Sequence, residues 1–371
     1  MLTGSHDMMN RAHNLPARRA LAASVARLMA TRSVSNPLAP FLERQGVVLL
    51  DGGTGTALGD DPQKHALWGA QLLFSLKGHE VVLEAHRKFL EAGADVICTN
   101  SYQVSFEAFT HADAFSSLPG GAITKEKFQL RYTNDVLRTS VELAKKARHD
   151  FWKASSDMGS RLRPLVAAAV GPAGDNLSVW TGATDAETSV HDVPDEAVAL
   201  YYRRKLAALE KSKPDLIALE TIPSLREARL ALAALEEVAP ERPAWVAFIC
   251  RDGATTAAGD DFGDAVREVS QHRQVMATGL NCTAPGHVEA LLRRAKAAAP
   301  DAALVAYPNS GEAWDAREGE RCWSGAGSVL GGDDASAMRT WGAALVGGCC
   351  RVTDVQIRQF RDALLRATPS A

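Results

Sequence analysis

The chain has 371 residues, of which 46% are hydrophobic and 23% are charged, and its formal net charge is −3. This composition is typical of a globular protein with a large buried core, and one barrel domain commonly reaches this length. The sequence contains no apolar run of the roughly 20 residues that span a bilayer and no basic run interleaved with aromatic residues, so neither a membrane nor a nucleic-acid partner is expected.

Residues 1–40 differ in composition from the rest of the chain. They carry five arginines and a single acid, Asp7, and they are rich in alanine and serine with amphipathic spacing. Such a composition is typical of a mitochondrial transit peptide, and the alternative is an extension without regular structure. We therefore expect a flexible or targeting extension at 1–40 and one domain at 41–371. A cytoplasmic location is expected, with a mitochondrial one as the alternative.

From residue 46 onward, eight short apolar runs alternate with longer amphipathic segments. The runs are apolar throughout, as expected of parallel strands that are covered on both faces. The predicted strands are 47–51, 95–100, 164–170, 216–221, 244–250, 275–282, 302–309 and 343–350. Helical periodicity predicts helices at 79–93, 134–150, 195–212, 224–238 and 286–299.

Eight strand–helix units without a long linker predict a single (β/α)8 TIM barrel with an N-terminal extension. An open doubly wound sheet is the alternative, and it is disfavoured because "LDGGTGT" is not a G-x-G-x-x-G turn that opens a helix. Two segments fit the repeat poorly. We expect an extended excursion at 148–163 and a long loop at 310–338, which is a candidate lid on the catalytic face.

The unusual polar residues fall at the carboxyl ends of the predicted strands. In a barrel these ends converge on one mouth, which is where catalytic residues lie. The residues are Asp51, Gly52 and Gly53 at the first strand, Glu220 at the fourth, Asn281 and Cys282 at the sixth, and Cys349 and Cys350 at the eighth. Residues far apart in the sequence are thereby expected to meet.

The six cysteines are too few for a disulfide scaffold in a chain of this length. Cys98 and Cys250 lie inside apolar strands and are interpreted as core residues, and Cys322 lies on the predicted loop. Gly347 and Gly348 precede the adjacent pair Cys349 and Cys350. Because glycine accepts backbone angles that other residues avoid, the strand is expected to kink there and turn both thiols inward.

With Cys282, the pair provides three thiolates, which suit tetrahedral Zn²⁺ with one open position. A vicinal pair alone also fits core packing or a redox-sensitive pair. Three thiolates neutralise Zn²⁺ and leave a net charge of −1, so water would be polarised poorly. A fourth thiol bound there would lose its proton yet stay electron-rich, which favours sulfur alkylation over hydrolysis. No catalytic residue is expected beyond the thiolate of the substrate itself.

Six segments resemble, in order, the signature segments of zinc-dependent homocysteine S-methyltransferases: "LDGGTGTAL", "TNSYQVSFEAF", "ALETIPS", "GLNCTAP", "AYPNSGE" and "GGCCRVT". The resemblance implies a homocysteine-binding barrel that transfers a methyl group to L-homocysteine and forms methionine. It implies that Cys282, Cys349 and Cys350 hold the zinc. It also implies that Asp51 and Glu220 receive the substrate ammonium, and that Gly52 and Gly53 approach the substrate carboxylate. For Asn281, a substrate contact and a purely structural hydrogen bond both stay open.

The expected methyl donor is a sulfonium, S-methylmethionine first and S-adenosylmethionine second, with betaine as an alternative. Four aromatic residues at strand ends or in loops could shelter such a cation, namely Tyr102, Trp180, Trp314 and Trp323. Methylfolate transfer through cobalamin would require further domains. A non-enzymatic zinc or thiol redox protein is the alternative from another class, and the sequence leaves the oligomeric state open.

Overall fold

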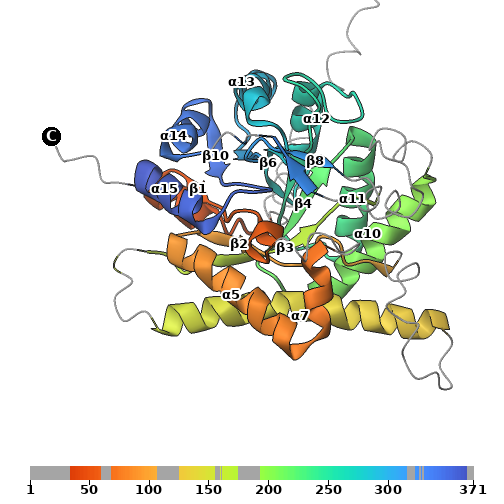
Figure 1. The fold of residues 1–371 in the computed structure, drawn as a ribbon. Helices are drawn as coiled ribbons and strands as arrows, with labels where there is room; N and C mark the ends of the chain where they lie inside the picture. The colour runs from red at the N-terminus through yellow and green to blue at the C-terminus, as the bar shows by residue number, and fades with distance from the viewer. Residues whose placement is uncertain are drawn as a thin grey trace, which may run out of the picture. The chain divides into compact units, whose positions relative to one another are not determined.

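The computed structural model describes residues 34–59, 68–106, 125–154, 159, 161–173, 193–315, 322–325, 327 and 330–365. Residues 1–33, most of the predicted extension, lie outside these ranges. The described residues from Asn36 onward belong to one compact unit, in which a ring of strands is surrounded by helices (Figure 1).

Eight parallel strands form the ring, in the order β1-β10-β7-β6-β5-β4-β3-β2. A parallel bridge between Leu50 and Val96 joins the first strand to the second and closes it. The strands are β1 (Val48–Leu49), β2 (Val96–Cys98), β3 (Leu165–Val170), β4 (Leu216–Ile222), β5 (Ala244–Phe248), β6 (Val275–Asn281), β7 (Leu304–Tyr307) and β10 (Ala343–Val346). Each overlaps one predicted strand, so the predicted TIM barrel is confirmed.

The long helices cover the outside of the ring and include all five predicted ones. They are α5 (Leu76–Ala92), α7 (Lys125–Ala154), α10 (Asp195–Glu210), α11 (Leu225–Val238), α12 (Phe262–Val269), α13 (Val288–Ala298), α14 (Gly332–Thr340) and α15 (Asp354–Leu365). Shorter helical elements are α2 (Ala39–Gln45), α3 (Thr54–Ala57), η1 (Trp68–Phe74) and η3 (Pro285–His287). Among the described residues, none of the helices has both the length and the apolar character that crossing a membrane requires.

Local sequence signals set where the helices begin. The hydroxyl of Ser224 accepts a hydrogen bond from the Glu227 amide and caps α11, and Ser75 caps α5 in the same way through Gly78. Helix α5 ends at Gly93, whose φ of 110° is in the left-handed region that favours glycine. These caps fix how the chain leaves β4 and how it enters β2.

Two segments differ from their predictions. Residues 148–154 continue α7 instead of forming an extended excursion, because no glycine or proline interrupts the helix before Ala154. Within 310–338, β8 (Ala313–Asp315) pairs antiparallel with β9 (Cys322–Ser324), and α14 begins at Gly332. A lid function for this segment stays a prediction.

The barrel interior is filled mainly by small and β-branched side chains around one large ring. Trp245 of β5 is fully buried there, and Ala167, Ala218 and Ala277 from other strands belong to the same cluster. Because these alanines are small, the indole fits inside the ring of strands. Tyr307 of β7 belongs to this cluster as well and lies next to the site described below.

Candidate metal and substrate site

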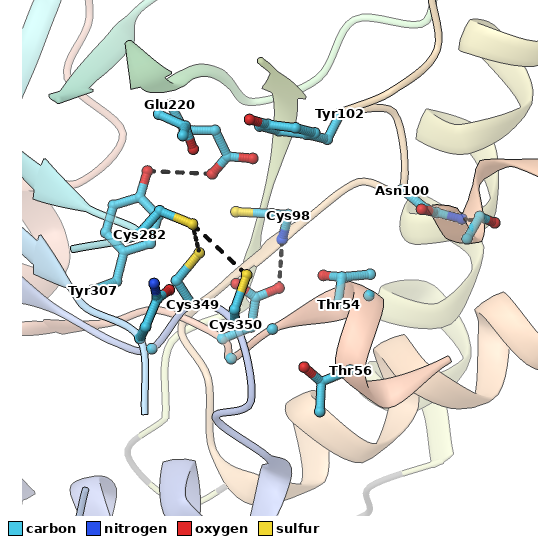
Figure 2. A pocket seen from close by; sticks show the side chains of 18 of the residues that line it. Thr54, Thr56, Cys98, Asn100, Tyr102, Glu220, Cys282, Tyr307, Cys349 and Cys350 are labelled. Carbon is cyan, nitrogen blue, oxygen red and sulfur yellow. Dashed lines mark hydrogen bonds between the residues drawn. The ribbon is translucent and has the colours of Figure 1, made fainter. Parts of the chain in front are cut away.

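A cavity of about 350 Å³ lies at the carboxyl ends of the strands (Figure 2). Of the residues predicted from sequence, all except Asn281 line it: Asp51, Gly52, Gly53, Glu220, Cys282, Cys349 and Cys350. Asn281 is fully buried beside it. The barrel therefore brings together residues from β1, β4, β6 and β10, as the predicted topology required.

The three cysteines point their sulfur atoms toward one another (Figure 2). The Sγ atom of Cys282 lies 3.3 Å from that of Cys349 and 3.7 Å from that of Cys350, and all three lie within 4.8 Å of one another. A tetrahedral zinc ion with Zn–S bonds of about 2.3 Å places its sulfur ligands about 3.8 Å apart. The donor set therefore fits such an ion in both chemistry and spacing.

The three thiols are electrostatically coupled. The pKa of the Cys349 thiol lies well below its usual range because of its hydrogen-bond contacts with the thiols of Cys282 and Cys350. The same contact with Cys349 raises the pKa of Cys282. The cluster thus favours the thiolate form of Cys349, and a metal ion would bind all three cysteines as thiolates.

Steric closeness, rather than backbone angle, explains the glycines before the cysteine pair. Neither Gly347 nor Gly348 has a positive φ, so the predicted special conformation is wrong. A Cβ atom on Gly347 would lie 2.6 Å from Leu50 Cβ and 2.9 Å from Asp51 O, and one on Gly348 would overlap the side chain of Val352. Glycine is needed because the turn packs directly against the loop after β1.

Gly52 and Gly53 complete the same close contact from the other side. The Gly53 amide donates a hydrogen bond of 2.9 Å to Val352 O, and a Cβ atom on Gly53 would lie 2.6 Å from Cys349 O. A Cβ atom on Gly52 would overlap Val352 O. Both glycines thus allow β1 to approach the cysteine turn, and their contact with a substrate carboxylate stays a prediction.

Asn281 makes its visible contacts within the protein. Its Oδ1 atom accepts from the Thr221 amide, its Nδ2 atom donates to Thr221 Oγ1, and Nδ2 lies 3.8 Å from Cys349 Sγ. These bonds match the structural alternative considered for Asn281, and a direct substrate contact stays a prediction.

Two carboxylates lie in the cavity beside the sulfurs, Asp51 buried and Glu220 partly buried. Asp51 is 4% exposed, and its Oδ2 atom accepts a 2.7 Å hydrogen bond from the Cys98 amide. Burial raises the pKa of Asp51 to about 7. Burial, followed by the negative charges of Cys349 and Asp51, raises the pKa of Glu220 to about 8. Because buried charges require a partner, this pair of acids is suited to receive a cation.

Sequence reasoning missed several residues that line the cavity. Cys98 was interpreted as a core residue and is indeed buried, yet it also lines the cavity. Tyr307 and Glu312 line it too, and both lie in "AYPNSGE", which could have drawn attention to them. Of the four aromatic candidates, Tyr102 lines the cavity, Trp180 lies outside the described residues, and Trp314 pairs with Trp323 in the β8–β9 pair.

Comparison with known proteins matches almost the whole barrel. A family model described as homocysteine S-methyltransferase matches residues 48–364. Homocysteine S-methyltransferase 1 of Zea mays is 35% identical over 325 residues, which cover 84% of this chain and 93% of that protein. Homocysteine S-methyltransferase YbgG of Bacillus subtilis is 31% identical over 333 residues, covering 88% and 96%. The crystal structure of the Escherichia coli homocysteine methyltransferase MmuM in its metallated form superposes with a TM-score of 0.71 at 29% identity, covering 88% of this chain and 99% of that one.

Proposed function

The chain belongs to the homocysteine S-methyltransferase family, and from that premise we propose that its methyl donor is a sulfonium and that its metal is zinc, held by Cys282, Cys349 and Cys350. The observation that carries the proposal is the meeting of three sulfurs, within 4.8 Å of one another, in one cavity with the two acids Asp51 and Glu220. A molecule that carries both a thiol and an ammonium can meet both groups at once.

The choice of zinc rests on the donor set. Three thiolates at this spacing suit a tetrahedral, borderline-soft ion with one open position. When bound, the ion would take the sulfur of homocysteine into that position and keep it as a thiolate near neutral pH. The chain's own contribution is to hold the cysteine turn in place through the Cys349 amide, which donates to Pro308 O at 2.8 Å, and the Gly348 amide, which donates to Asp51 O at 3.1 Å.

Asp51 and Glu220 receive the ammonium of homocysteine in this proposal. Removal from water makes two negative charges at these positions unfavourable, as the raised pKa of each carboxyl indicates. An ammonium placed between them supplies the missing counter-charge, so binding is coupled to ionisation of the acids. The selectivity for an amino acid thiol follows from this pairing.

The donor class is inferred from the charge of the cavity wall. Among the described residues, three carboxylates line the cavity and no lysine, arginine or histidine does. The third acid is Glu312. Burial acts to raise its pKa, but the hydrogen bond from Ser310 and the nearby Arg351 outweigh burial and hold the pKa below its usual range. A cationic donor is therefore favoured over a neutral or anionic one, and the Tyr102 ring in the same cavity can face its charge.

The methyl transfer itself requires positioning and no base. The thiolate attacks the methyl carbon, a new S–C bond forms, and the bond to the sulfonium sulfur breaks with its electron pair staying on that sulfur. The products are methionine and a neutral thioether, and no proton moves in this step. The protein lowers the barrier by holding the two sulfur atoms in line with the methyl group.

The test is methionine formation from L-homocysteine with S-methylmethionine, S-adenosylmethionine and betaine, using protein loaded with zinc or treated with a chelator. We expect the fastest reaction with S-methylmethionine and none after metal removal, with activity restored by zinc. Turnover with betaine alone would overturn the sulfonium assignment. Full activity in metal-free protein would overturn the role of zinc.

Cys349→Ala tests the ligand assignment. We expect it to lose zinc stoichiometry and at least about a thousandfold in activity, because a site with two thiolates cannot complete the proposed set. Cys250→Ala is the matched control, since Cys250 is buried at the end of β5 but does not line the cavity. Unchanged sulfur coordination after homocysteine addition, measured by X-ray absorption, would instead favour a thiol redox protein.

A further inference from the structure

Two buried side chains and one partly buried acid form a hydrogen-bonded chain that ends in the cavity. The Trp245 indole nitrogen donates to the Tyr307 hydroxyl at 2.9 Å, and the Tyr307 hydroxyl donates to Glu220 Oε2 at 3.2 Å (Figure 2). The three residues come from β5, β7 and β4. The order of donors runs from the centre of the barrel toward the acid.

The direction of this chain is set by its first member. An indole N–H can only donate, so the oxygen of Tyr307 accepts from it and the hydroxyl proton is left to point elsewhere. Trp245 is fully buried among small side chains, and its ring meets that of Tyr307 edge to face, with centroids 6.3 Å apart at 82°. The tyrosine hydroxyl is therefore fixed in both position and polarity.

The same tyrosine also holds the sulfur end of the site. The backbone oxygen of Tyr307 accepts a 3.3 Å hydrogen bond from the amide of Cys282, a residue whose φ of 52° is in the strained left-handed region. One residue thus contacts the backbone of a cysteine with its own backbone and the acid Glu220 with its side chain. Both ends of the substrate site depend on the placement of Tyr307.

Each acid is anchored through one oxygen. Tyr307 engages Oε2 of Glu220, and the Cys98 amide engages Oδ2 of Asp51. The second oxygen of each carboxylate is then held at a set distance from the three sulfurs. For a substrate bound at both its thiol and its ammonium, that distance selects the number of methylene groups between them.

We propose that Tyr307, oriented by Trp245, is a positioning residue that fixes the spacing between the sulfur site and Glu220 and thereby favours homocysteine over its shorter homologue cysteine. This inference rests on the proposed function, because it takes Glu220 as a receptor of the substrate ammonium. Without the hydroxyl, the Glu220 carboxylate gains rotational freedom, so a thiol with a shorter chain is penalised less.

The experiment compares Tyr307→Phe, Trp245→Phe and a matched control in zinc-loaded protein. The control is Tyr202→Phe, since Tyr202 is buried and donates a 2.7 Å hydrogen bond to Glu227 away from the cavity. For each variant we would measure kcat, the KM of homocysteine, the inhibition constant of L-cysteine, zinc content and melting temperature.

Tyr307→Phe is expected to raise the KM of homocysteine about tenfold, to change kcat less than about threefold and to leave the zinc content at one per chain. The ratio of the cysteine inhibition constant to the homocysteine KM should fall, and Trp245→Phe should give the same pattern more weakly. Tyr202→Phe should lower the melting temperature and leave both constants unchanged.

Two outcomes would overturn the inference: an unchanged ratio in Tyr307→Phe, or a loss of kcat and zinc together, which is the pattern of a merely structural residue. Failure of the proposed function looks different, because the unmodified protein would then form no methionine from any donor. In that case, calorimetric titration of the zinc-loaded variants with homocysteine and cysteine still compares the affinities for the two thiols. Equal losses of affinity for both thiols would contradict the role of Tyr307 in setting the spacing.

Discussion

Asn281 holds Thr221 in a left-handed backbone conformation at the end of β4. Thr221 has a φ of 60°, which is strained for a β-branched residue, and Asn281 Oδ1 accepts its amide at 2.7 Å while Nδ2 donates to its hydroxyl at 2.9 Å. Since Glu220 directly precedes Thr221 and Nδ2 also reaches Cys349 Sγ, one amide side chain links the acid to the cysteine cluster.

Asn281→Ala is expected to destabilise the fold by about 2–3 kcal/mol, because a buried amide loses its partner and a strained residue loses its restraint. The KM of homocysteine should rise as well. Urea unfolding and steady-state kinetics measure both effects. Gln274→Ala is the control, since Gln274 is a buried amide that bonds Ala239 O and Arg242 O at the opposite end of β6. Gln274→Ala should lose stability while its KM for homocysteine stays at the value of the unmodified protein. An unchanged KM in Asn281→Ala would contradict the proposed link between Asn281 and the site.

Gly347→Ala tests the steric role of the glycine pair. The added methyl group would meet Leu50 Cβ at 2.6 Å and Asp51 O at 2.9 Å, so the turn or the loop after β1 must shift. We expect a loss of about 1–3 kcal/mol in stability and weaker zinc binding. Gly286→Ala should change stability by less than about 0.5 kcal/mol, because nothing lies within 4 Å of its added methyl group. Equal effects of the two substitutions would show that space at position 347 is not limiting.

Glu312→Gln is expected to raise the KM of the sulfonium donor about threefold to tenfold and to leave the KM of homocysteine unchanged. The reason is that Glu312 is a charged wall residue, whereas Asp51 and Glu220 are the residues proposed to receive the ammonium of homocysteine. The difference from the unmodified protein should shrink only slightly as salt is added, because the Glu312 side chain is 17% exposed and a partly buried charge is screened less than an exposed one. Glu289→Gln, on the outer surface of α13, is the control. An increase confined to the KM of homocysteine would contradict the prediction, because it would indicate that Glu312 interacts with homocysteine and not with the donor.

Glu220→Gln is expected to stabilise the metal-free protein at high pH. The pKa of Glu220 is raised from 4.5 to about 8, so between these values the folded state keeps a proton that the unfolded state loses. Stability therefore falls as pH rises through this window, and the neutral glutamine removes that loss. We expect melting temperatures that differ little at pH 4.5 and diverge by about 2 °C or more at pH 9. Glu237→Gln, at an exposed position, should show no such divergence, and a constant difference at all pH values would contradict the buried charge.

The sequence was most informative about the features that local pattern encodes. Continuous apolar runs revealed the eight strands, and residues at their carboxyl ends revealed the cavity, because parallel strands of a barrel share one mouth. Helices α12, α14 and α15 were not among the predicted helices; α12 and α14 have only 8 and 9 residues, and α14 contains glycine, serine and two aspartates that weaken its periodicity.

Contacts between distant strands could not be predicted in the same way. That Tyr307 bonds Glu220 depends on the relative rotation of β7 and β4, and that Gly347 faces Leu50 depends on the close packing of β10 against β1. No local sequence pattern predicts either contact. The same holds for Cys98, which packs in the core and faces the cavity at once.

Asp51 also has a structural role, because its side chain helps to connect the first strand of the barrel to the second. Strand β1 has only two residues, the Leu50–Val96 bridge follows it, and the next link between the two strands is the bond from the Cys98 amide to the Asp51 side chain. The carboxylate that is proposed to receive the substrate ammonium thus also fastens the wall of the barrel. Even glutamate at position 51, which preserves the charge, would move the oxygen by one methylene and strain the wall. A change of substrate that requires a different residue at position 51 would therefore also disturb the barrel wall, whereas changes at neighbouring positions would leave the wall intact.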